Sequence, residues 1–135
     1  MIFKDVVSYD VNKVSAIEKK VNVELPSKIK IATDKFDEYD ESYVKITDNE
    51  CKKMFEQKVK NNLLWKNKLD FKIKALLPIN IQYGCENYDY FLFYNITDDE
   101  YNKVRSRGQY ECIFIAYDCD LNRLLIIDGI KVDMD

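Results

Sequence analysis

The sequence contains no histidine. Histidine is the usual general base near neutral pH and the commonest zinc ligand. Its absence excludes the Ser-His and Cys-His nucleophile pairs. Glycine is also scarce, at three residues, and no glycine-rich phosphate-binding motif occurs. The chain therefore lacks the signatures of most enzyme classes, and we predict a non-enzymatic protein without a cofactor.

Sequence patterns for export, metal binding through cysteine and membrane insertion are missing as well. The four cysteines form no C-x-x-C pair, and the N-terminal residues show no signal-peptide pattern. The apolar runs are far shorter than the ~20 residues of a membrane-spanning helix. We therefore expect a cytoplasmic protein with reduced thiols and no membrane contact.

What is present is typical of a folded domain. The 135 residues are 47% hydrophobic and 33% charged, with only two prolines. This composition excludes a disordered tail, and the length predicts a single globular domain over residues 1–135. No motif identifies a family.

Alternating apolar and polar residues predict several strands. A continuous or interrupted strand is expected over 69–83, where Leu69, Phe71, Ile73 and Ala75 alternate with charged residues. The most apolar segments predict a hairpin of 110–118 with 124–127. Further strands are expected at 2–9, 28–33, 42–46, 88–96 and 130–132.

Helical spacing predicts a helix over about 11–22. Two Thr-x-x-Glu capping boxes, Thr47 to Glu50 and Thr97 to Glu100, predict two further helices, the second ending before Gly108. Together with the strands, these helices predict an α+β fold. We expect an antiparallel or mixed sheet of five to seven strands with two or three helices packed mainly on one face.

Charge is segregated along the chain although the net charge is only −3. Residues 34–50 hold seven acidic residues against two lysines, whereas residues 51–74 hold eight lysines against two acidic residues. Blocks of opposite sign steer association and help specify a partner.

The acidic block interleaves carboxylates with aromatic rings. Aromatic side chains anchor in pockets of a partner, and carboxylates meet its lysines and arginines. We therefore predict a protein partner with a basic surface. The predicted partner-binding residues are Asp34, Phe36, Asp37, Glu38, Tyr39, Asp40, Glu41 and Tyr43.

A small, acidic, histidine-free binding protein of this kind resembles in general character the bacterial immunity proteins and antitoxins. The resemblance is one of character and covers no motif. It implies a protein that neutralises a toxin, such as a nuclease, by occluding its basic active site. A phage- or virus-encoded inhibitor of host defence would have the same character.

Two alternatives use other residues. The lysines of 51–74, with Arg105 and Arg107, could contact the phosphates of a nucleic acid. The aspartates Asp118, Asp120 and Asp128 could instead bind Mg²⁺ or Mn²⁺ in a small metal-dependent enzyme. Aspartates near a hairpin are more often turn formers, and neither a metal site nor a nucleic-acid partner is the favoured interpretation.

Overall fold

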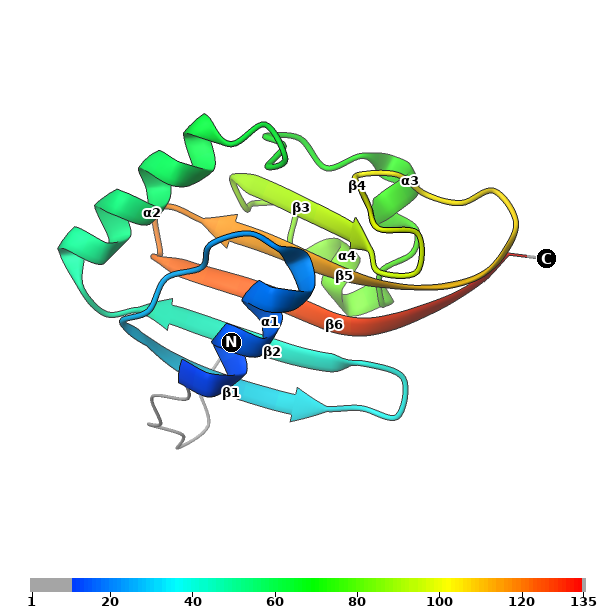
Figure 1. The fold of residues 1–135 in the computed structure, drawn as a ribbon, viewed down its shortest axis with the longest axis horizontal. Helices are drawn as coiled ribbons and strands as arrows, with labels where there is room; N and C mark the ends of the chain where they lie inside the picture. The colour runs from blue at the N-terminus through cyan, green and yellow to red at the C-terminus, as the bar shows by residue number, and fades with distance from the viewer. Residues whose placement is uncertain (1–10, 135) are drawn as a thin grey trace.

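The computed structural model describes residues 11–134. One sheet of six antiparallel strands runs through the described part of the chain, in the order β1-β2-β6-β5-β3-β4 (Figure 1). Its strands are β1 Ile29–Lys35, β2 Asp40–Ile46, β3 Tyr90–Asn95, β4 Glu100–Tyr101, β5 Gly108–Asp118 and β6 Arg123–Met134. The predicted α+β class is confirmed. The strand expected at 2–9 lies outside the described residues.

Within residues 11–134, four helices pack on the two faces of this sheet. They are α1 Val11–Val21, α2 Asn49–Asn61, α3 Phe71–Lys74 and α4 Ile79–Gly84. The two longer helices, α1 and α2, share one face, and the short α3 and α4 cover part of the other face, whereas we expected two or three helices mainly on one face. Figure 1 shows α1 in front of the sheet and α4 behind it.

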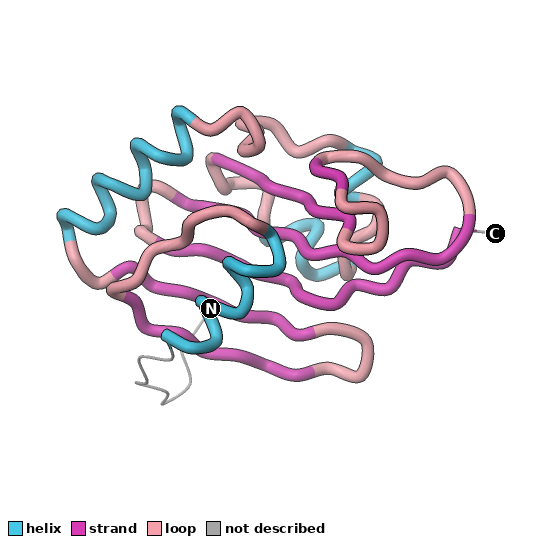
Figure 2. Tube along the Cα trace, in the orientation of Figure 1, coloured by secondary structure: helices cyan, strands magenta, loops and turns pink. Residues whose placement is uncertain are grey.

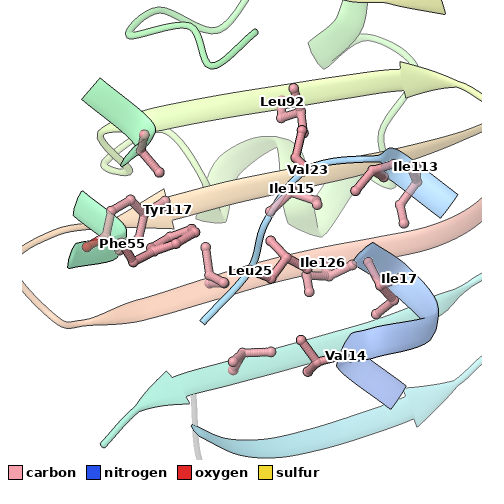
Figure 3. Packing of buried hydrophobic residues seen from close by; sticks show 14 of the residues in the cluster. Val14, Ile17, Val23, Leu25, Phe55, Leu92, Ile113, Ile115, Tyr117 and Ile126 are labelled. Carbon is pink, nitrogen blue, oxygen red and sulfur yellow. The ribbon is translucent and has the colours of Figure 1, made fainter. Parts of the chain in front are cut away.

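Each face of the sheet has its own hydrophobic core. Figure 3 shows Val14 and Ile17 of α1 close to Ile126, and Phe55 of α2 beside Tyr117. The rings of Phe55 and Tyr117 meet edge to face, with centroids 4.9 Å apart. These contacts fix α2 on the sheet, because an edge-to-face aromatic pair adds to the free energy gained by burial.

The strand predicted over 69–83 is wrong, because this segment forms α3 and α4. Its buried residues, spaced four positions apart, are Ile73 of α3, Leu77 between the two helices and Ile81 of α4, and all three pack against the same face of the sheet. Phe71 is 76% exposed, although strict alternation would bury it with Ile73. The Asp70 carboxylate caps α3 by accepting a hydrogen bond from the Lys72 amide at 2.7 Å.

The helix predicted after Thr97 is also wrong. The Thr97 hydroxyl accepts a hydrogen bond from the Glu111 amide at 2.9 Å, so it caps no helix. Asp99 adopts a left-handed conformation with φ of 54°, and Asp98 accepts hydrogen bonds from Asn95 and Arg105. These bonds hold a turn that leads into the short strand β4.

The start of α2 and the extent of β6 also differ slightly from the prediction. The N-cap of α2 is Asp48, whose carboxylate accepts from the Cys51 amide at 2.9 Å, and not Thr47. The strand predicted separately at 130–132 is the continuation of β6. It passes through Gly129, whose φ of 82° allows a bulge opposite β5.

Candidate functional site

The predicted binding residues all lie on the hairpin of β1 and β2. These strands pair in continuous register from Ile29 with Ile46 to Lys35 with Asp40. At the tip, the Phe36 amide donates to the Tyr39 carbonyl at 2.9 Å. Figure 2 shows the connecting loop at one end of this pair of strands. The paired strands therefore hold the tip in a defined position.

Two aromatic rings pack together at the tip. The centroids of Phe36 and Tyr39 are 5.0 Å apart, with the planes tilted by 31°. Phe36 is 48% exposed, whereas Tyr39 is half-buried and packs against the core of the α3–α4 face. Burial, and the nearby Glu41 and Glu38, raise the pKa of the Tyr39 hydroxyl. Phe36 is thus an exposed ring that packs against Tyr39, and Tyr39 in turn packs against the core.

The carboxylates around these rings form no ion pairs with the described residues. Asp34, Asp37 and Glu38 are exposed and Asp40 is half-buried. Among residues 11–134, no ion pair holds any of the four. The tip therefore presents a negative potential to the solvent, and a basic partner would gain from meeting it.

Two of the eight predicted residues point inward. Glu41 is only 4% exposed, and its carboxylate accepts a hydrogen bond from the Tyr43 hydroxyl. Burial raises the pKa of the Tyr43 hydroxyl, as does its bond to Glu41. These two side chains support the hairpin from within, so the tip consists of the exposed Asp34, Phe36, Asp37 and Glu38 with the half-buried Tyr39 and Asp40.

Tyr88 and Arg123 lie near Tyr43, although no pattern in the sequence places them at this hairpin. The Arg123 guanidinium lies 5.8 Å from the centre of the Tyr88 ring, within range of a cation–π contact. Tyr88 and Tyr43 both pack against the core of the α3–α4 face. Tyr88 belongs to an aromatic-rich run in the sequence, but nothing there indicates that it lies near the acidic hairpin.

The lysine block of 51–74 is spread over α2, the following loop and α3. Three of its lysines form ion pairs, with Lys58 bound to Glu24 at 2.6 Å, Lys60 to Glu56 at 3.1 Å and Lys74 to Glu86. Arg105, the proposed supplement to this block, is held by Asp98 at 2.5 Å. Internal carboxylates thus neutralise part of the positive charge that a nucleic acid would need.

Two of the three aspartates of the metal hypothesis, Asp118 and Asp128, lie apart. Asp118 is 7% exposed and accepts a hydrogen bond from the Leu121 amide, whereas Asp128 is ion-paired with Lys20 at 2.9 Å. Asp118 lies opposite Arg123 in the β5–β6 pairing, and Arg123 is five residues from Asp128 along β6. Asp118 and Asp128 are therefore separated by about 17 Å along the strand direction. Among the described residues, no group of three or more acidic or cysteine side chains is arranged to hold a metal ion.

Comparison of the chain with protein-family models, curated proteins and solved structures found no significant match. The case for any function therefore depends on the geometry of this chain. None of the helices in the described part is both long and apolar enough to span a membrane.

Proposed function

We propose that this chain is a non-enzymatic binding protein that acts in the cytoplasm and inhibits a protein with a basic functional site. The observation that carries the proposal is the tip of the β1–β2 hairpin. There, carboxylates without ion pairs to the described residues surround the half-exposed Phe36, at the end of two strands whose pairing is unbroken.

Such a tip would act by attraction followed by occlusion. Long-range attraction between the carboxylates and a basic cleft raises the rate of encounter. Phe36 would then enter an apolar pocket, and the ring of Tyr39 would support it from behind. A target that binds nucleic acid has such a cleft because it must hold phosphates. We therefore propose a toxin, such as a nuclease, as the class of target, and the chain as its immunity protein or antitoxin.

The test is capture of the target by three forms of the full chain. The first is the wild type. The second is a tip variant, Asp37→Lys/Glu38→Lys/Asp40→Lys, which leaves the buried Glu41 in place. The third is a control with the same change in net charge, Glu50→Lys/Asp120→Lys/Asp133→Lys, at exposed positions away from the tip. Each form is exposed to lysate of the source cells with and without nuclease treatment.

We expect the wild type and the control to retain one protein in stoichiometric amount after nuclease treatment, and the tip variant to lose it. Adding an equimolar amount of the chain should then abolish the activity of that protein. Retention by the tip variant would place the interface elsewhere. Recovery of nucleic acid, or of proteins that nuclease treatment removes, would favour the lysine block.

A further inference from the structure

The strand β1 forms one margin of the sheet (Figure 1). Within residues 11–134 it pairs only with β2, on its inner side. The strand is seven residues long and contains no proline, and its pairing with β2 is free of bulges. Prolines, bulges, short length and charged side chains, especially lysines, are the usual features that prevent an edge strand from pairing with another chain. This edge lacks the first three, and its charged residues, Lys30, Asp34 and Lys35, are of both signs.

The hydrogen bonds at both ends of the hairpin identify which backbone groups face outward. The Thr47 amide donates to the Lys28 carbonyl at 3.0 Å, and the Phe36 amide donates to the Tyr39 carbonyl at 2.9 Å. Bonding to a neighbouring antiparallel strand alternates along the chain, so the even-numbered residues from 28 to 36 bond to β2. The outward-facing amides and carbonyls belong to Ile29, Ile31, Thr33 and Lys35.

We propose that this edge pairs with β1 of a second copy of the chain, in antiparallel orientation, with a two-fold axis at Ala32. This register places Ile31 opposite Thr33 of the second copy and Ile29 opposite Lys35. All four are outward-facing residues, as hydrogen-bonded pairs must be. The register also overlaps all seven residues of the strand, and small side chains meet at the axis. The arrangement closes on itself and cannot extend into a fibre.

Charge complementarity supports this register. Within the sheet, Lys30 lies opposite Lys45 and Asp34 lies opposite Glu41, and like charges in such pairs are unfavourable. No ion pair among residues 11–134 holds Lys30 or Asp34. Across the proposed axis, Lys30 faces Asp34 of the second copy, twice by symmetry. These are non-hydrogen-bonded pairs, in which opposing side chains approach most closely.

The dimer would carry two acidic tips. Phe36 of one copy lies opposite Lys28 of the other, so the two tips are separated by eight residues along the strand, or about 27 Å. A dimer could thus engage two targets or two sites on an oligomeric target. This inference uses only the strand edge and stands whether or not the tip binds a toxin.

The test is sedimentation equilibrium of the full chain over a range of concentrations. We expect a concentration-dependent mass that rises from 16.1 kDa towards twice that value. The association should be weak, because two seven-residue strands form a small interface. The single variants Lys30→Asp and Asp34→Lys each place like charges opposite each other twice, and each should weaken association by about tenfold. The double variant restores opposite charges and should associate as the wild type does.

Two further variants separate strand pairing from general charge effects. Lys53→Asp makes the same change on an exposed position of α2 and should leave the association unchanged. Thr33→Pro removes an outward-facing amide and no backbone bond to β2, and should abolish the dimer while circular dichroism shows the fold retained. It also removes the hydroxyl that lies 2.9 Å from the Ser42 hydroxyl, so Thr33→Val, which removes the hydroxyl alone, is its control and should leave the dimer intact. A wild type that stays monomeric would overturn the proposal. So would a dimer that both single reversals and Thr33→Pro leave intact.

Discussion

Replacing Tyr43 with phenylalanine tests whether the inner part of the acidic hairpin supports the fold. The substitution removes one oxygen, and with it the hydrogen bond that the hydroxyl donates to the Glu41 carboxylate. Glu41 is 4% exposed, so water replaces the lost donor poorly. A hydrogen bond to a charged group contributes about 1.5–3 kcal/mol, and we expect the free energy of unfolding to fall by that amount.

The corresponding change in melting temperature follows from the size of the chain. At ~2.1 cal/mol/K per residue, the unfolding entropy of 135 residues is about 0.28 kcal/mol/K. A loss of about 1.5–3 kcal/mol therefore lowers the melting temperature by about 5–11 °C.

The matched control is Tyr39→Phe, the same chemical change on the same strand face near the tip. The Tyr39 hydroxyl makes no hydrogen bond to the described residues, and its loss should change the melting temperature by less than about 2 °C. Calorimetry or thermal circular dichroism provides both values. Equal effects of the two substitutions would refute the view that Glu41 and Tyr43 form a buried support.

Further predictions concern the rest of the fold. Phe55→Ala should reduce the free energy of unfolding by about 3–5 kcal/mol in chemical denaturation, since Phe55 is 3% exposed, whereas Met54→Ala next to it, 60% exposed, should cost under about 0.5 kcal/mol. The hydrogen bond from Arg105 lowers the pKa of Asp98 from its ordinary 3.8, so the folded state gains stability above that pH and loses it as the pH falls through the lowered pKa. Asp98→Asn should therefore flatten the stability curve measured below pH 4. Burial raises the pKa of the Cys112 thiol to about 12, and mass spectrometry should find it unmodified by an alkylating agent at pH 8 until the chain unfolds.

Periodic burial explains which elements could be predicted from the sequence. The strands β5 and β6 are rich in β-branched and aromatic residues, and both faces of the sheet are covered there, so they appear as continuous apolar runs. The helix α2 has a helical apolar stripe that includes the buried Phe55 and Val59. Such patterns are strong because tertiary burial and local preference agree.

The failures occur where two patterns compete. In 69–83 the apolar residues fit both an alternation of two and a spacing of four, and packing against the sheet selects the helical set. After Thr97, the Thr-x-x-Glu pattern is present, but the carboxylate of Asp98 bonds to Asn95 and Arg105 and stabilises a turn instead. A capping box describes a local preference, and competing hydrogen bonds of neighbouring residues override it here.

The candidate site was predictable only where it depends on residues that are close in the sequence. The acidic and aromatic residues are contiguous in the sequence, so their meeting on one hairpin follows from local pairing. Alternation along β2 places Glu41 and Tyr43 on the same face of the sheet, but it does not reveal their hydrogen bond. The position of Tyr88 depends on the packing of distant strands, and sequence spacing carries no signal for it.

The central claim is that the acidic tip recognises a basic site on another protein, and the rate of association tests it most directly. The captured target, once purified, would be mixed in a stopped-flow instrument with the wild type, the tip variant or the charge-matched control, at low and at high salt. We predict rapid association of the wild type and the control that slows with salt, and association of the tip variant that is at least about tenfold slower at low salt. Equal rates for the tip variant and the control would contradict the claim.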